Sequence, residues 1–298
     1  MITKQKIKKI YYNGFSNLSE KIYFSFEFFP PKNIENDIQL EVIAKKLSEY
    51  EPSFFSITYS PIHKNRYRTQ NMALKIQKIT NIPTAAHLTC TEISQEDLIT
   101  IIKNYWKNGI HNIVALRGDI INKNFNQNQM YAIDLVKLLK NIANFDITVA
   151  AYPEMHPEAI SKKQDLLFLK QKIEAGANRA ITQFFFDVDK YLYFREQCIK
   201  IGITKNIIPG ILPIKNLLQL KKFSKLTNVH IPKDIHEIFN TKNNNNNEYN
   251  NIIGSIFTFC IIKKLYQEGV RHFHFYTLND FITITAMCNL LKNINAIN

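Results

Sequence analysis

The stretch YFSFEFFPPK (residues 23–32) is typical of a buried β-strand that stops abruptly. Its aromatic residues favour a strand, and the two prolines end it because proline cannot donate a hydrogen bond to a neighbouring strand. Successive side chains of a strand point to opposite faces, so Tyr23, Ser25 and Glu27 share one face. One carboxylate, that of Glu27, is therefore expected at the end of an otherwise apolar strand.

The rest of the chain repeats this alternation of a strand with a helix. Eight segments have strand patterns: 21–28, 54–59, 83–89, 111–118, 146–152, 179–186, 206–212 and 271–277. Helical patterns lie between them without a break in composition. About eight such repeats in this length predict an α/β fold, a single (β/α)₈ TIM barrel formed by one domain over residues 1–298.

Helix boundaries follow the same plan. Segment 94–109 opens with the N-cap residue Ser94 and closes with Gly109, and segment 165–178 closes in the same way at Gly176. An open, doubly wound sheet is the alternative fold. A sheet of that kind that binds a dinucleotide usually has a glycine-rich first turn, and the sequence has no G-x-G-x-x-G motif. The barrel is therefore favoured.

Composition predicts a folded protein of the cytoplasm. Hydrophobic residues make up 45% of the 298 residues, which is enough for a large core. The four cysteines are scattered without a C-x-x-C pair, so their spacing predicts neither a disulfide framework nor a metal site. Residues 1–20 read as a basic N-terminal extension that lacks the apolar stretch of a signal peptide. The longest apolar run, 252–262, is shorter than the ~20 residues that span a membrane.

The net charge of +13 would suit a nucleic-acid partner. However, the lysines and arginines are spread along the chain rather than gathered in one basic stripe. A bias toward A/T-rich codons would account for the many lysines, isoleucines and asparagines, including the Asn-rich segment 240–251, which reads as a surface loop. We therefore expect neither a nucleic-acid partner nor a membrane partner.

Polar residues gather where the predicted strands end. In a TIM barrel the catalytic groups lie at the carboxyl ends of the strands, and this is where Glu27 stands. The other strand ends contribute Thr58, Tyr59, His87, Arg117, Gly118, Asp119, Tyr152, His156 and Gln183. The sequence therefore predicts an active site on this rim of the barrel.

Two further patterns allow more than one interpretation. His272 and His274 are two apart on a strand and could face one metal ion, but without a third ligand a hydrogen-bonded or core position is favoured. Asp165 and Lys172 are seven apart on a helix, so they share a face and could bind one ligand. Otherwise they are a solvated surface pair too distant for a salt bridge.

Seven motifs occur in an order and spacing that resemble a known family. They are SFEFFPPK, AAHLTC, HNIVALRGD, AAYPEMHPEA, AGANRAITQFFFD, IIPGILP and FHFYTLN. Together they resemble bacterial methylenetetrahydrofolate reductase, from about residue 22 to the last helix. The resemblance implies a cytoplasmic homotetramer of TIM barrels that holds FAD and uses NADH, with NADPH left open, since no dinucleotide motif decides between them.

The resemblance also implies roles for particular residues. Glu27 corresponds to the general acid, and Asp119 lies beside both the flavin and the folate. Positions that correspond to FAD or nicotinamide contacts are Thr58, Tyr59, His87, Arg117, Gly118, Asp119, Ala132, Tyr152, His156, Asp165 and Lys172. Positions that correspond to folate or nicotinamide contacts are Asp119, Gln183, Gln219 and Phe223.

The implied reaction is the reduction of 5,10-methylenetetrahydrofolate to 5-methyltetrahydrofolate for methionine synthesis, with FAD as the hydride carrier. Ring opening of the folate needs a proton at N10, and Glu27 would supply it. We expect its pKa to be raised through desolvation by Phe26, Phe28 and Phe29. Asp119 would stabilise the cation that develops at N5.

Four positions depart from the family pattern. Pro61 stands at a flavin-contact position. Phe168 and Gln171 stand where the enterobacterial enzyme has an Asn and an Arg that help to hold FAD, and Asp280 replaces an arginine that contacts folate. These changes bear on ligand affinity rather than on the chemistry. Two other functions stay open at this point, namely a flavin-dependent barrel oxidoreductase with another substrate and a nucleic-acid-binding barrel without redox activity.

Overall fold

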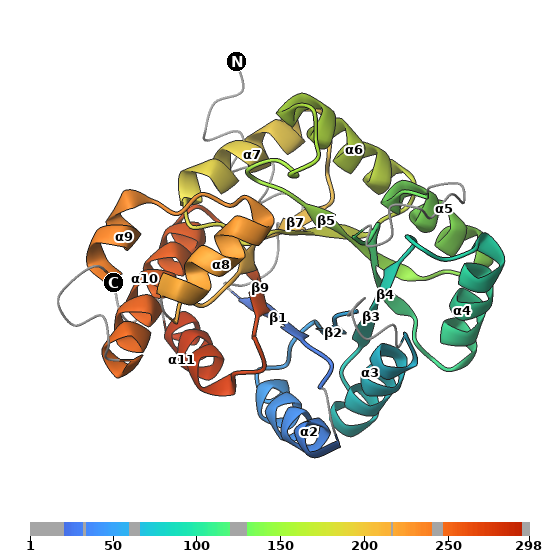
Figure 1. Cartoon of the computed structure of the whole chain (residues 1–298), viewed down its shortest axis with the longest axis horizontal. Helices are drawn as coiled ribbons and strands as arrows, with labels where there is room; N and C mark the ends of the chain where they lie inside the picture. The colour runs from blue at the N-terminus through green and yellow to red at the C-terminus, as the bar shows by residue number, and fades with distance from the viewer. Residues whose placement is uncertain are drawn as a thin grey trace.

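The computed structural model is a barrel of parallel strands surrounded by helices (Figure 1). It describes residues 21–31, 34–59, 66–119, 130–215, 217–239 and 247–293. The strands are β1 (Tyr23–Phe28), β2 (Phe54–Ile57), β3 (Thr84–Thr89), β4 (Asn112–Leu116), β5 (Asp146–Ala151), β6 (Arg179–Thr182), β7 (Asn206–Ile208), β8 (Gly210–Ile211) and β9 (His272–Tyr276). The helices are α2 (Ile34–Ser48), α3 (Arg66–Thr80), α4 (Gln95–Lys107), α5 (Ala132–Ile142), α6 (Lys162–Glu174), α7 (Val188–Lys200), α8 (Leu217–Thr227), α9 (Lys233–Phe239), α10 (Asn247–Gln267) and α11 (Phe281–Lys292).

The barrel closes through a strand that proline divides in two. The order of the strands is β7-β6-β5-β4-β3-β2-β1-β9-β8, and every pair is parallel. β7 pairs with β6, while β8 pairs with β9, and only Pro209 separates β7 from β8. The two halves therefore join the ends of the sheet. The predicted TIM barrel is confirmed, with each of the eight predicted strands present and 206–212 split at this proline.

Two apolar layers explain which way the strand residues face. Phe24, Phe26 and Phe28 belong to the large cluster that also contains core residues of the helices. A second, smaller cluster fills the barrel and takes its buried members from different strands: Phe54, Ala85, Val114, Ile181 and Ile208. The period of two along β1 thus places the phenylalanines outward and Glu27 inward, as the sequence predicts.

The helix boundaries agree with the sequence where it has cap signals. Ser94 Oγ accepts a hydrogen bond of 3.1 Å from the backbone N–H of Asp97 at the start of α4. After α6 the chain turns at Gly176, whose φ of +121° suits glycine. The loop predicted for 240–251 is partly wrong, because α10 begins at Asn247. Asn250 is buried there, so tertiary packing has overridden a weak intrinsic helix propensity.

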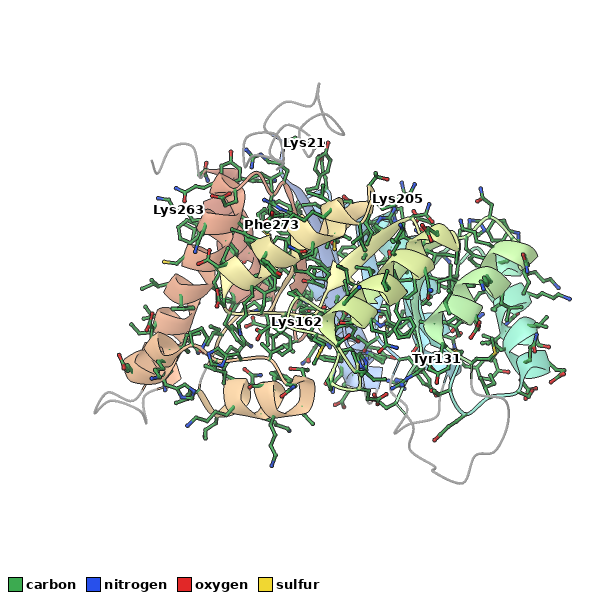
Figure 2. All side chains as sticks on the ribbon, turned by 90° about the horizontal axis from the view of Figure 1, so that it is seen from above. Lys21, Tyr131, Lys162, Lys205, Lys263 and Phe273 are labelled. Carbon is green, nitrogen blue, oxygen red and sulfur yellow. The ribbon has the colours of Figure 1, made fainter. Side chains whose placement is uncertain are left out.

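The two ends of the barrel are distinct. In Figure 2, Lys21 and Lys205, which precede β1 and β7, lie toward one side of the molecule. Tyr131, the N-cap of α5 after β4, and Lys162, the first residue of α6 after β5, lie further toward the other side. The second side carries the carboxyl ends of the strands. Residues 1–20 and 240–246, predicted as an extension and as part of a loop, lie outside the described residues. Within the described part of the chain, no helix is long and apolar enough to cross a membrane.

Gly210→Ala is expected to destabilise the barrel where it closes. A Cβ at this position would lie 2.2 Å from the carbonyl oxygen of Thr182 and 2.6 Å from the ring of Tyr276. Because the nearest atom is backbone, the strands themselves must move, and we expect a loss of about 3 kcal/mol in the free energy of unfolding. Urea denaturation measures the loss. Ile211→Val is the control and should cost about 1 kcal/mol; an equally small loss for Gly210→Ala would contradict the argument.

Candidate active site

Two adjoining cavities open at the carboxyl ends of the strands. The larger encloses about 960 Å³ between the ends of β3–β5 and the helices α5 and α6. The smaller encloses about 450 Å³ over the mouth of the barrel and has Glu27 in its wall. Four residues line both cavities: Tyr59, Leu116, Ala150 and Tyr152. The two cavities therefore adjoin along these four side chains.

Glu27 lies between two histidines from other strands. Its Oε2 is 3.3 Å from Nε2 of His87 on β3 and 3.6 Å from Nε2 of His274 on β9. These separations are ion-pair distances rather than well-aligned hydrogen bonds. Burial alone would raise the pKa of Glu27, but the attraction of His87, together with the contacts of both imidazoles, lowers its pKa to about 2. The carboxyl group is therefore ionised in the ligand-free protein.

The expected rise in the pKa of Glu27 is therefore wrong for this state. Phe26 and Phe28 are fully buried, but they pack into the helix layer on the other face of β1. Phe29 lines the smaller cavity and is 46% exposed, so it leaves room for water. The residues adjacent to Glu27 in sequence thus do not surround its carboxylate. The imidazoles of His87 and His274 lie next to it and lower its pKa.

A column of polar side chains runs down the barrel interior below Glu27. Ser25 Oγ lies 2.9 Å from His274 Nδ1 and 3.2 Å from His272 Nε2. Burial lowers the pKa of His274, and it lowers the pKa of His272 to about 3, which keeps the His272 ring neutral at physiological pH. The two histidines are thus hydrogen-bonded core residues, as the sequence favours.

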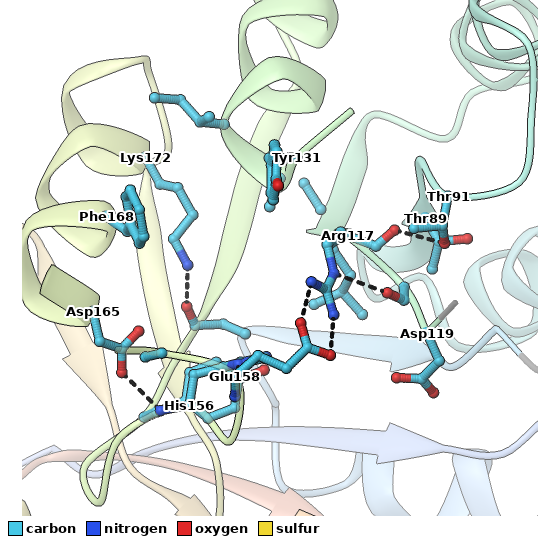
Figure 3. Close-up of a pocket in the computed structure, with 18 of the residues that line it drawn as sticks. Thr89, Thr91, Arg117, Asp119, Tyr131, His156, Glu158, Asp165, Phe168 and Lys172 are labelled. Atoms are coloured by element: carbon cyan, nitrogen blue, oxygen red, sulfur yellow. Dashed lines mark hydrogen bonds and ion pairs between the residues drawn. The ribbon is translucent and has the colours of Figure 1, made fainter. Parts of the chain in front are cut away.

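The end of β4 brings positive charge into the larger cavity. The guanidinium of Arg117 forms a bidentate ion pair with Glu158, in which Nη2 donates to Oε1 at 2.8 Å (Figure 3). Its Nε donates to the carbonyl of Gly118 at 3.2 Å. Glu158 is exposed, so its carboxylate can be exchanged for another anion without leaving a buried charge.

Gly118 is required by close packing. Its φ is +92°, and a Cβ would lie 2.3 Å from Oγ1 of Thr91 and 2.9 Å from Cβ of Thr89. No other residue fits without displacing these threonines, which also line the cavity. The backbone after Arg117 therefore turns tightly and leaves the cavity open.

The helix α6 supplies the opposite wall. Lys172 Nζ donates to the carbonyl of Ala150 at 2.7 Å, and burial lowers the pKa of this lysine to about 8 (Figure 3). Asp165 Oδ2 accepts a hydrogen bond of 2.9 Å from the backbone N–H of His156, which leaves Oδ1 for a ligand. Burial, reinforced by Asp165, raises the pKa of Tyr152 to about 12, so its phenol stays protonated. The larger cavity is thus lined by two basic side chains, by the carboxylate of Asp165 as a hydrogen-bond acceptor and by the phenol of Tyr152 as a donor.

Comparison of the sequence with known proteins shows which family the chain belongs to. The model of the family described as methylenetetrahydrofolate reductase matches residues 13–292. The chain belongs to this family. It is 53% identical over 274 residues to the 5,10-methylenetetrahydrofolate reductase of Buchnera aphidicola subsp. Schizaphis graminum, covering 92% of this chain and 93% of that one. It is 47% identical over 271 residues to the Escherichia coli 5,10-methylenetetrahydrofolate reductase, covering 91% of each chain. The protein is therefore an enzyme.

A solved structure supports the fold. A Clostridium thermocellum protein that binds two copies of 5-methyl-5,6,7,8-tetrahydrofolic acid superposes with a TM-score of 0.61, and the match covers 100% of both chains. Its sequence identity of 15% means that the likeness shows the barrel alone.

The structure gathers nearly all the residues that the family resemblance singles out. Those that line the larger cavity are Tyr59, Arg117, Gly118, Asp119, Ala132, Tyr152, His156, Asp165 and Lys172. Those that line the smaller cavity are Glu27, Thr58, Tyr59, His87, Tyr152, Gln183 and Phe223. Gln219 lines neither cavity, although it precedes Phe223 by one turn of α8 and shares its face. The roles of these residues in a methylenetetrahydrofolate reductase stay predictions.

The sequence did not connect two residues, His274 and Glu158, with their partners in the site. His274 reaches Glu27 from β9, and its position two residues after His272 on an inward face was the available signal. Glu158 pairs with Arg117 from the loop before α6, and nothing in its local sequence indicates this. Of the departures from the methylenetetrahydrofolate reductase pattern, Asp280 caps α11 and pairs with Lys215 at 2.7 Å. Phe168 and Gln171 line the larger cavity, and Pro61 lies outside the described residues.

Proposed function

We propose that the protein is an FAD-dependent enzyme that reduces 5,10-methylenetetrahydrofolate to 5-methyltetrahydrofolate with NADH. The observation that carries this proposal is that the two cavities adjoin, with the Glu27 carboxylate in one and the basic side chains of Arg117 and Lys172 in the other. The proposal extends to a cytoplasmic homotetramer that supplies methyl groups for methionine synthesis. NADPH is the alternative reductant.

The larger cavity fits FAD in size and in chemistry. Its volume of about 960 Å³ is at the upper end for ligand pockets, as a dinucleotide needs. The guanidinium of Arg117 and the ammonium of Lys172 suit a pyrophosphate, and the carboxylate of Asp165 suits ribose hydroxyls. FAD, when bound, supplies the hydride transfer between nicotinamide and folate.

The smaller cavity contains the groups for the folate chemistry. Opening of the five-membered ring needs a proton at N10, and Glu27 is the carboxyl group in this cavity wall. Because it is ionised in the free protein, it must gain a proton before it acts. The imidazole of His87, whose Nε2 lies 3.3 Å from Glu27 Oε2, is its nearest side-chain partner. Gln183 and Phe223 offer an amide and an aromatic face to the substrate.

An anaerobic absorbance titration tests the proposed function. Purified protein is incubated with FAD, then given NADH and afterwards methylenetetrahydrofolate. We expect the flavin absorbance to be lost with NADH and to return with the folate. Loss without return would assign a flavin-dependent barrel oxidoreductase with another substrate. Failure to bind FAD would overturn the proposal.

Lys172 gives FAD binding an expected pH dependence. Its pKa of about 8 leaves much of the amine neutral above pH 8, whereas a bound phosphate would raise the pKa and favour the cation. Binding then takes up a proton, so affinity should be highest below pH 8 and fall by up to about tenfold per pH unit above it. Fluorescence titration of FAD between about pH 6.5 and 9.5 measures this slope. Lys172→Arg, which stays charged, should flatten it, and a flat wild-type profile would contradict the assignment.

A further inference from the structure

An aromatic side chain stands exposed on the wall of the larger cavity. Phe168 on α6 is 50% exposed and lines the cavity. The core formed by the described residues includes its neighbours Leu166 and Leu169, but not Phe168. Exposing a phenylalanine gains nothing for the fold, because its apolar surface stays in water. In a cavity wall, such a ring offers an aromatic face to a ligand.

Phe168 shares one face of α6 with two charged residues that also line the cavity. Asp165, Phe168 and Lys172 are spaced by three and four residues, which places them on one face of α6. Figure 3 shows the ring of Phe168 beside the stem of Lys172, with Asp165 further along the same helix. Ile160, 88% exposed, lines the same cavity from the loop before the helix. This part of the wall is therefore apolar, and the charged side chains of Asp165 and Lys172 line the cavity from the same helix.

Together, the groups on this face of α6 are of the kinds that bind the adenosine part of a dinucleotide. A carboxylate with a free oxygen accepts the hydroxyls of a ribose, and an ammonium binds a phosphate. A planar base attached to that ribose needs an apolar or aromatic face to stack on, which a phenylalanine provides. No other aromatic ring of the described part of α6 lines this cavity.

We propose that Phe168 stacks on the adenine ring of the bound cofactor and holds the adenosine half of FAD on α6. The inference rests on the proposed function for the identity of the cofactor. Phe168 replaces the asparagine of the enterobacterial enzyme noted above, so this chain holds the base through ring contact rather than through an amide. The flavin end of the cofactor does not depend on this contact.

Binding of three probes to the Phe168→Ala protein tests the inference. FAD affinity is measured by fluorescence titration, FMN affinity in the same way, and ADP affinity by competition against FAD. We expect Phe168→Ala to weaken FAD and ADP by about tenfold and to leave FMN unchanged, because FMN lacks the adenosine. Phe168→Trp should keep or strengthen FAD binding, since it preserves an aromatic face.

Leu167→Ala is the matched control. Leu167 is the preceding residue of α6 and is 43% exposed, but it does not line the cavity. Its substitution should change FAD affinity by less than about twofold. Unchanged FAD and ADP binding by Phe168→Ala, or equal weakening of FAD and FMN, would overturn the inference while leaving the proposed function intact. A wild-type protein that binds no FAD would overturn both.

Discussion

Glu27→Gln is expected to abolish reduction of the methylene-folate while leaving reduction of the flavin by NADH nearly intact. Glutamine keeps the shape of the side chain but cannot donate the proton that N10 requires, and loss of a general acid typically costs about 10²–10⁴-fold in rate. The nicotinamide step needs no proton from this group. Anaerobic stopped-flow absorbance measures the two half-reactions separately.

The control for Glu27→Gln is the same chemical change on the outside of the barrel. Glu35 lies in the first turn of α2, is exposed and lines neither cavity. Glu35→Gln should leave both half-reactions within about twofold of the wild type. If Glu27→Gln slows both half-reactions equally, it has disturbed the cavity as a whole, and Glu27 is not the acid.

The barrel could be read from the sequence because its signals are local. Each strand is a short apolar run with a period of two, and each is followed by a helical pattern, so the topology rules leave few arrangements. The rim position of Glu27 follows from the same periodicity and from the prolines after it. Pro209 split the seventh strand, an effect that a proline inside a predicted strand already indicates.

The electrostatics of the site could not be read in this way. The residues that set the pKa of Glu27 come from β3 and β9, far from it in sequence, and only the barrel brings His87 and His274 to the carboxylate. The adjacent phenylalanines suggested the opposite shift because sequence proximity ignores which face of a strand a residue occupies. The ion pair of Arg117 with Glu158 is equally non-local.

The start of α10 at Asn247 shows that amino-acid composition alone does not predict where this helix begins. A run of asparagines reads as a loop because asparagine competes with the helix through its own side-chain hydrogen bonds. In the fold, α10 packs against the segment after β8, where Gly254 approaches the backbone of Ile214 so closely that a Cβ would lie 2.0 Å from its oxygen. Contacts of this kind decide where α10 lies, and they are invisible in the sequence.

Asp119→Asn should slow the folate half-reaction by about 10²-fold, as loss of one preorganised charged group at a developing ion typically does. Asp119 follows the end of β4, is exposed and lines the larger cavity (Figure 3). In the proposed reaction a carboxylate there would stabilise the cation that forms at N5, whereas an amide keeps the shape and loses the charge. Because the side chain is exposed, the free energy of unfolding should change by less than about 0.5 kcal/mol.

Single-turnover absorbance with the folate, set beside urea denaturation, separates these two effects of Asp119→Asn. Asp234 on α9 is also exposed and lies outside both cavities, so Asp234→Asn controls for the loss of one surface charge. A normal folate half-reaction in Asp119→Asn would remove the residue from the chemistry. A loss of stability as large as the loss of rate would make it a structural residue. Slow folate reduction by an Asp119→Asn protein of normal stability would mean that the Asp119 carboxylate stabilises the cation at N5.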